Sequence, residues 1–195
     1  MPMNSLRHHS VPSALGPLLL VADTADRLCG LYLPDHRRGP ARAPGRHQAG
    51  GVIDRAAAQL DEYFAGDRTV FDLPLVTAGS LLQEKVWAML RILPYGTTTT
   101  YGQIAADLGL GAGAARAVGT ANARNPLSII VPCHRVVGTS GSLTGYAGGL
   151  AAKRHLLAHE RRSAEQSWQR DASAAELGRS ADPWNLAQKA VACLK

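Results

Sequence analysis

The chain has 195 residues, of which 46% are hydrophobic, and it carries a formal net charge of +6. A chain of this length and apolar content holds one compact core or two small ones and is too apolar to be disordered. Its apolar runs fall far short of the roughly 20 residues that a membrane-spanning helix needs, and its first ten residues lack the hydrophobic centre of a signal peptide. We therefore expect a soluble, cytoplasmic protein without membrane association.

Charge and cysteine content narrow the class further. Lysine and arginine outnumber aspartate and glutamate by 21 to 15, which favours polyanionic partners without establishing one. The three cysteines, Cys29, Cys133 and Cys193, lie far apart and form no Cys-x-x-Cys pair. Neither a disulfide framework nor a zinc cluster is indicated, and at least one thiol should stay free.

The first elements predicted along the chain belong to a small α/β unit. Apolar segments 17–22 and 28–33 predict two strands joined as a hairpin, and the Pro-, Gly- and Arg-rich residues 34–51 predict a mobile basic loop. A helix that ends at Gly66 and a strand over 69–75 follow. The apolar face predicted for this helix consists of Val52, Ile53, Ala56, Ala57, Leu60 and Phe64.

A group of helices is predicted next. Ser80 is suited to cap a helix over 81–93, which Pro94-Tyr95-Gly96 ends. Ala- and Gly-rich segments 102–108 and 112–121, joined by a glycine-rich link, predict a helix-turn-helix. Arg116 is the long polar side chain of the second helix, which suits close approach to a narrow groove of DNA with little base readout. A tightly packed core helix explains the same composition equally well.

The residues suited to chemistry surround one cysteine. An apolar, strand-like run at 129–131 leads through Pro132 into Cys133, His134 and Arg135, and a helix over 149–159 follows a Gly-rich loop. Positive neighbours lower the pKa of a thiol, and an adjacent imidazole can accept its proton. The pattern predicts a nucleophilic Cys133, with an inert buried cysteine as the other interpretation.

The chain beyond residue 162 has a weaker hydrophobic pattern. It contains Trp168, Trp184 and a helix-compatible segment at 186–194. Such a tail could dock or stay loose.

Taken together, these residues resemble the O6-alkylguanine-DNA alkyltransferases over about 82–160. The matching motifs are Pro132-Cys133-His134-Arg135-Val136, Asn125-Pro126, Gly145-Tyr146-Ala147-Gly148-Gly149 and Ala115-Arg116-Ala117-Val118-Gly119. The resemblance implies an α/β amino-terminal domain at 1–78, with a small sheet and helices. It also implies a mainly α-helical carboxy-terminal domain at 79–162, with a winged-helix-like helix-turn-helix, and leaves a tail at 163–195 without a role.

The resemblance also implies a reaction. Members of this family transfer an alkyl group, typically methyl, from O6 of guanine in double-stranded DNA, and some from O4 of thymine, to their own cysteine. Carried over, Cys133 is the acceptor in a single irreversible turnover that needs no cofactor. His134 would act through a water as its base, Glu160 would orient and charge-balance His134, and Asn125 would hold the active-site turn.

Substrate contacts follow from the same resemblance. Tyr101 would contact the flipped base and the adjacent phosphate, Tyr146 would form a pocket wall, and the backbone of Val136 and Ala147 would line the pocket. Arg116 would fill the space that the flipped base vacates. The implied partner is double-stranded DNA containing O6-alkylguanine, bound by a monomer, with cooperativity on DNA and preferred alkyl size left open.

No metal is expected. The family's zinc ligands, present in some relatives, are not reproduced by the candidate residues His8, His9, Cys29, His36 and His47.

Three other functions fit parts of the pattern. A non-catalytic alkyltransferase-like protein binds lesions but carries another residue in place of the reactive cysteine, so Cys133 argues against it. A Cys-His thiol hydrolase would turn over repeatedly. A helix-turn-helix regulator would need base contacts that the side-chain-poor segment 112–121 does not favour.

Overall fold

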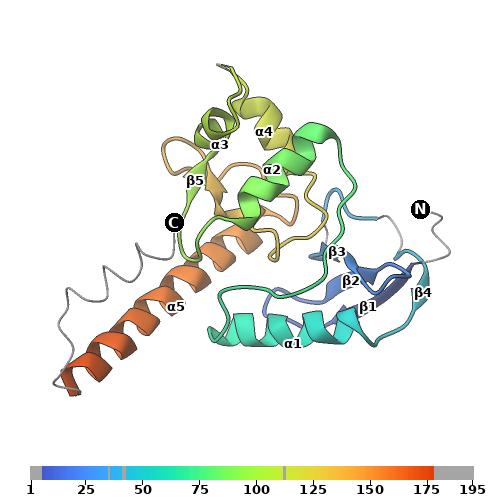
Figure 1. The fold of residues 1–195 in the computed structure, drawn as a ribbon, viewed down its shortest axis with the longest axis horizontal. Helices are drawn as coiled ribbons and strands as arrows, with labels where there is room; N and C mark the ends of the chain where they lie inside the picture. Colours follow the sequence, from blue (N-terminus) through green and yellow to red (C-terminus); the bar gives the residue numbers. More distant parts are fainter. Residues whose placement is uncertain (1–5, 35, 41–42, 112, 178–195) are drawn as a thin grey trace, which may run out of the picture. The chain divides into compact units, whose positions relative to one another are not determined.

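A computed structural model describes residues 6–34, 36–40, 43–111 and 113–177 (Figure 1). The described residues up to Arg161 belong to one compact unit, and a second begins at Arg162. Every helix in these described ranges is too short or too polar to cross a lipid bilayer.

A four-stranded sheet forms the amino-terminal part, in the order β3-β2-β1-β4. Its strands are β1 (Arg7–Val11), β2 (Leu18–Ala22), β3 (Leu28–Tyr32) and β4 (Arg46–His47). The predicted hairpin is confirmed as the antiparallel pair β2–β3, and β1 pairs antiparallel with β2 and parallel with β4. Strand β1 was not predicted, and β4 lies within the segment predicted as a loop.

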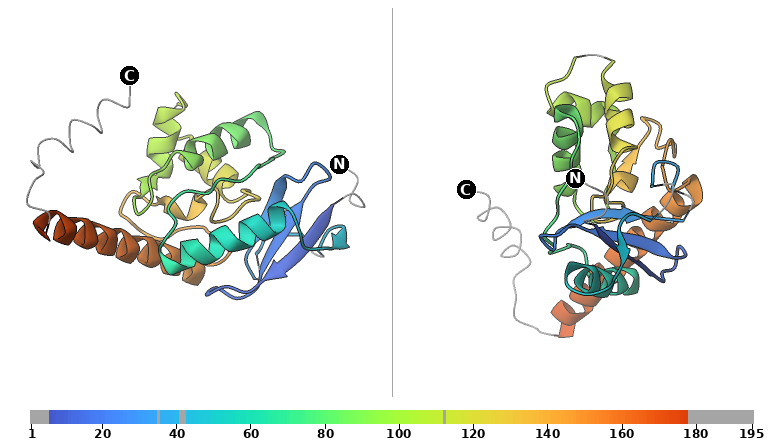
Figure 2. Two further views of the ribbon diagram at one scale, coloured as in Figure 1. Left: turned by 60° about the horizontal axis from the view of Figure 1, so that its bottom comes forward. Right: turned by 90° about the vertical axis from the view of Figure 1, so that its right-hand side faces the viewer.

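Helix α1 (Val52–Ala65) packs against β1 and β2 and runs along the sheet (Figures 1 and 2). It ends as predicted at Gly66, whose left-handed φ of 86° suits a residue without a Cβ. The apolar face predicted for α1 is wrong by one position at the carboxy-terminal end of the helix. Tyr63 is fully buried, whereas Phe64 is only half-buried.

The outer edge of β3 is covered by two other segments of the chain. Leu28 forms an isolated bridge with Leu75, and Leu31 forms one with Leu127. The expected strand over 69–75 is therefore wrong except for this bridge at its last residue. Covering satisfies the exposed backbone groups of an edge strand, and here it attaches the segment that precedes Cys133 to the sheet.

Three helices form a second group: α2 (Leu81–Arg91), α3 (Tyr101–Asp107) and α4 (Ala115–Asn122). The predicted cap at Ser80 is confirmed, and it is part of a capping box that was not predicted, in which the Ser80 and Gln83 side chains each bond the other's backbone. Helix α4 contacts both α2 and α3, and the Trp87 indole N–H donates to the Ala121 carbonyl at 3.0 Å. The predicted helix-turn-helix is thus α3 and α4.

Near the cysteine one expected element is wrong, one strand pair was not predicted, and one helix is longer than expected. Residues 129–131 form turns instead of a strand, and β5 (Thr99–Thr100) pairs in parallel with β6 (Val136–Val137). The expected helix over 149–159 is the start of α5 (Leu150–Leu177), whose residues from Arg162 belong to the second unit. Ala112, Cys193, Trp184 and segment 186–194 lie outside the described residues.

Candidate active site

Cys133 begins a single 3-10 turn, η2 (Cys133–Arg135), and is 4% exposed. The Asn125 side-chain amide donates to its Sγ at 3.0 Å and to the Val131 carbonyl at 2.7 Å. The side-chain oxygen Oδ1 of Asn125 accepts from the Leu127 N–H at 3.0 Å. Asn125 therefore links the segment from Leu127 to Val131 to the Cys133 sulfur. This is the position expected of a residue that holds the active-site turn.

The segment that precedes Cys133 is attached to strand β3 by two backbone hydrogen bonds. Leu31 donates its N–H to the Pro126 carbonyl at 2.8 Å and accepts from the Ser128 N–H at 3.1 Å. Between this anchor and Cys133, Ile129 has a φ of +71°. A left-handed β-branched residue costs on the order of 1–3 kcal/mol, and full burial of Ile129 and Leu127 offsets that cost.

Burial raises the pKa of Cys133 to about 11, because desolvation outweighs the hydrogen bond from Asn125 and the nearby Lys153 charge. The expectation that basic neighbours lower this pKa is wrong for the free protein. A pocket of about 340 Å³ reaches Pro132 and Arg135, and one of about 300 Å³ reaches Glu160, but Cys133 lines neither of them and does not line the remote pocket of about 370 Å³. At rest the sulfur is a covered, protonated thiol.

His134 is fully buried, and its Nε2 lies 2.8 Å from Glu160 Oε1. An ionised carboxylate only accepts hydrogen bonds, so Nε2 carries the proton in this pair and Nδ1 keeps a lone pair. Nδ1 is buried, and no described residue lies within hydrogen-bond distance of it. Desolvation lowers the pKa of His134 despite Glu160, which keeps the ring neutral and Nδ1 able to accept a proton.

Glu160 is the most heavily bonded side chain of the site. Burial raises its pKa, but hydrogen bonds from His134 and Arg135 and their charges outweigh burial and hold the pKa at about 2. Five donors reach the two oxygens. They are His134 Nε2 at 2.8 Å, Arg135 Nε and Nη2 each at 2.9 Å, Tyr63 Oη at 2.9 Å and the Gly96 N–H at 3.1 Å.

Two of the residues predicted to meet the substrate, Tyr101 and Tyr146, lie close enough to Cys133 to interact with its charge. Tyr101 donates its hydroxyl to the Thr144 carbonyl at 3.0 Å. Tyr146 is buried, and desolvation raises the pKa of its hydroxyl well above the usual range, with a further contribution from the nearby Cys133 sulfur and an opposing one from Ser128. Val136 and Ala147 are both buried. The predicted residues are therefore brought to one region, except Arg116.

Lys153, in α5, was missed by the sequence analysis. Its Nζ is fully buried and donates to the carbonyls of Val136, at 2.6 Å, and Thr144, at 2.9 Å. Desolvation lowers its pKa to about 8, while the sulfur of Cys133 opposes that shift. A lysine in the first turns of an amphipathic helix reads as a surface residue, so only the fold reveals this one.

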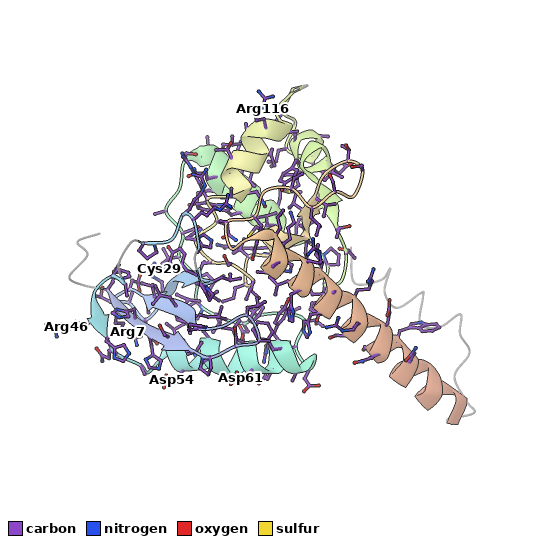
Figure 3. The ribbon with its side chains drawn as sticks, turned by 180° about the vertical axis from the view of Figure 1, so that it is seen from behind. Arg7, Cys29, Arg46, Asp54, Asp61 and Arg116 are labelled. Carbon is purple, nitrogen blue, oxygen red and sulfur yellow. The ribbon has the colours of Figure 1, made fainter. Side chains whose placement is uncertain are left out.

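Arg116 stands apart from the buried residues. It is exposed on α4 and lies at the outer end of the α3–α4 pair (Figure 3). In the described ranges, no three His, Cys, Asp or Glu side chains are close enough to hold a metal ion.

A helix-turn-helix beside a buried cysteine, with Asn, His and Glu arranged around the thiol, defines a protein that combines DNA binding with thiol chemistry. Residues 81–162 match the family described as "6-O-methylguanine DNA methyltransferase, DNA binding domain". Residues 6–77 match "6-O-methylguanine DNA methyltransferase, ribonuclease-like domain". The chain belongs to the 6-O-methylguanine DNA methyltransferase family.

Proteins with similar sequences match this chain over nearly their whole length. A methylated-DNA–protein-cysteine methyltransferase of Mycolicibacterium paratuberculosis is 46% identical over 83% of this chain and 96% of its own. One from Salmonella typhimurium is 42% identical over 81% and 97%. The structure of Mycobacterium tuberculosis OGT in complex with DNA matches with a TM-score of 0.73 and 43% identity, over 80% of this chain and 94% of that one.

Proposed function

We propose that the protein repairs DNA by direct reversal, as a methylated-DNA–protein-cysteine methyltransferase. It takes the alkyl group from O6-alkylguanine, and less readily from O4-alkylthymine, in double-stranded DNA onto Cys133. The observation that carries the proposal is that two buried hydrogen-bonded pairs, Asn125–Cys133 and His134–Glu160, meet at consecutive residues of one turn, in a chain that belongs to this family. Residues 79–162 carry this chemistry, and residues 1–78 support it.

The first chemical step is removal of the thiol proton. Because burial raises the pKa of Cys133 to about 11, the thiol is protonated at pH 7. His134 Nδ1 has a free lone pair and takes this proton through a bridging water, and Glu160 stabilises the resulting imidazolium. The Asn125 amide, 3.0 Å from Sγ, stabilises the thiolate that forms.

The second step is attack on carbon. The thiolate electron pair forms the S–C bond while the C–O6 bond breaks, and its electrons pass to guanine. The guanine then takes a proton, so the net proton transfer is from Cys133 to the base. Tyr101 donates to the departing base in place of the Thr144 carbonyl, which its hydroxyl bonds in the free protein.

Access requires the base to leave the duplex, because O6 lies inside the stacked helix. Helix α4 offers small side chains over most of its length and Arg116 at an exposed position. This fits close approach to the minor groove and insertion of Arg116 into the vacated stack. The flipped base is received between Tyr101 and Tyr146, beside the backbone of Val136 and Ala147.

The product limits the protein to one turnover. A thioether has no carbonyl for water to attack and no good leaving group on sulfur, so nothing regenerates the thiol. We propose a monomer that acts once. A lesion-binding protein without chemistry is disfavoured because it would not need Cys133 or its proton acceptor.

The experiment uses duplex DNA with labelled O6-methylguanine, followed by mass analysis of the peptide that contains Cys133. We expect one added methyl group on Cys133. Cys133→Ser should keep DNA affinity and lose transfer. Folded protein that binds the duplex but leaves this peptide unlabelled would contradict the proposal.

A further inference from the structure

The amino-terminal helix α1 supplies one of the five donors to Glu160. Tyr63 is fully buried near the end of α1, and its hydroxyl donates to Glu160 Oε1 at 2.9 Å. The phenol must be the donor, because an ionised carboxylate cannot donate. We propose that Tyr63 is a positioning residue for the His134–Glu160 pair, so that the amino-terminal part of the chain sets the orientation and proton affinity of the catalytic base. This inference rests on the proposed function.

The position of Tyr63 is fixed from several sides. Its carbonyl accepts from the Gly66 N–H, which ends α1, and from His159 Nε2 at 2.7 Å. Its ring contacts those of Phe71 and Tyr95 at centroid distances of 5.6 and 6.0 Å. Two consecutive residues of α5, His159 and Glu160, thus bond the same residue of α1. A hydroxyl held this rigidly constrains the carboxylate that it bonds.

The hydrogen bonds at Glu160 Oε1 predict the direction in which Tyr63 changes the pKa of His134. Oε1 accepts from Tyr63, His134 and Arg135, so the three donors share one oxygen. Without the phenol, the negative charge of Oε1 is shared between two donors, and its bond to His134 strengthens. A stronger bond to the charged form of a base raises its pKa. Tyr63 therefore keeps His134 less basic and the carboxylate in place.

Burial makes this coupling larger than a similar contact at the surface. Tyr63, His134 and Glu160 are each 0% exposed, so solvent does not screen their interactions. Burial together with Glu160 raises the pKa of Tyr63 well above its usual range, which keeps the hydroxyl protonated and donating. The other charged or titratable groups that act on this pair are Arg135, Lys153, His159, Tyr95 and Tyr146.

Tyr63→Phe tests the inference, because it removes the hydroxyl and keeps the ring. Tyr32→Phe is the matched control, since Tyr32 is a half-buried tyrosine of β3 whose ring lies against His36. The first readout is the titration of His134 in free protein labelled with 15N in its imidazoles, with the His134 signal assigned by its loss in His134→Gln. We expect the His134 midpoint to rise by about half a pH unit in Tyr63→Phe and to stay unchanged in Tyr32→Phe.

The second readout is the rate of methyl transfer against pH. Protonated His134 cannot accept the thiol proton, so the acidic limb should move upward with the His134 midpoint. The plateau rate should fall about tenfold, since a positioned base contributes about 10² to 10⁴ in rate, while affinity for the duplex should not change. Unchanged titration and acidic limb in Tyr63→Phe, or an equal shift in Tyr32→Phe, would overturn the inference.

The two readouts separate this inference from the proposed function. If the wild-type protein transfers no methyl group, the proposed function fails, but the His134 titration still shows whether Tyr63 acts on the pair. If transfer occurs and the titration does not move, only the role of Tyr63 fails.

Discussion

Replacing Glu160 with glutamine should destabilise the protein by about 3 kcal/mol at pH 7. The carboxyl has a pKa of about 2 in the folded protein against an ordinary 4.5. Each unit is worth about 1.4 kcal/mol, so ionised Glu160 stabilises the folded state by about 3 kcal/mol. Glu160→Gln also leaves the buried Arg135 without its ionic partner, which agrees with the about 3–5 kcal/mol that breaking a buried pair costs.

The direction of the Glu160 pKa shift also predicts how the stability difference depends on pH. Because folding lowers the pKa of Glu160, its contribution is complete above pH 4.5 and is lost as pH falls from 4.5 towards 2. Urea unfolding at several pH values should therefore show the wild type losing its advantage over Glu160→Gln across that range. Glu62→Gln is the control, since Glu62 is 48% exposed and its pair with Arg68 is worth at most about 1 kcal/mol. A Glu160→Gln loss below about 1 kcal/mol at pH 7, or one that is independent of pH, would refute the reasoning.

Three further predictions concern the turn, the thiol and the DNA surface. Asn125→Ala removes three hydrogen bonds, so it should lower the free energy of unfolding by about 2–4 kcal/mol and abolish transfer. If denaturant unfolding shows a loss under about 1 kcal/mol, Asn125 does not have this structural role. In the free protein, iodoacetamide at pH 8 should modify Cys133 at least tenfold more slowly than a Cys133 peptide, because burial raises its pKa to about 11; equal rates by peptide mapping would contradict the covered thiol. Arg116→Ala should slow transfer from duplex about tenfold but not from the free alkylguanine base, while Arg55→Ala, which removes the same charge from α1, should affect neither; equal slowing with both substrates would remove Arg116 from base flipping.

Local signals explain which elements could be predicted. Ser80 and Gln83 form their bonds within one turn, and Gly66 ends α1 through its own backbone, so α2 and α1 were foreseen. The hairpin β2–β3 also depends on neighbouring residues. Strand β1 carries no apolar alternation and exists because β2 pairs with it, which the sequence of β1 alone does not indicate.

The sequence analysis named many of the residues that lie in the site, but it did not predict the pKa shifts of those residues. The Cys133-His134 dipeptide alone indicated only an imidazole beside the thiol, and the family resemblance supplied Glu160, 26 residues away, as the partner that His134 Nε2 contacts in the structure. Burial, which raises the pKa of Cys133, cannot be seen in a dipeptide. Tyr63 and Lys153 were missed because each is brought to the site by tertiary packing alone.

The same limit applies to the segment before the cysteine. Three apolar residues at 129–131 favour a strand by composition, but the bridge to β3 and the bonds of Asn125 hold this segment in turns, with Ile129 in the left-handed region. Tertiary contacts override local preference at this position.

The stoichiometry of methyl transfer tests the central claim most directly. The protein is incubated with a tenfold excess of duplex carrying labelled O6-methylguanine, and label on protein is followed to completion together with the repaired guanine. We predict a plateau at one methyl group per chain, all of it on Cys133, with an equal amount of guanine restored. Repair that continues beyond one equivalent, or label on another residue, would contradict a single irreversible transfer to this sulfur.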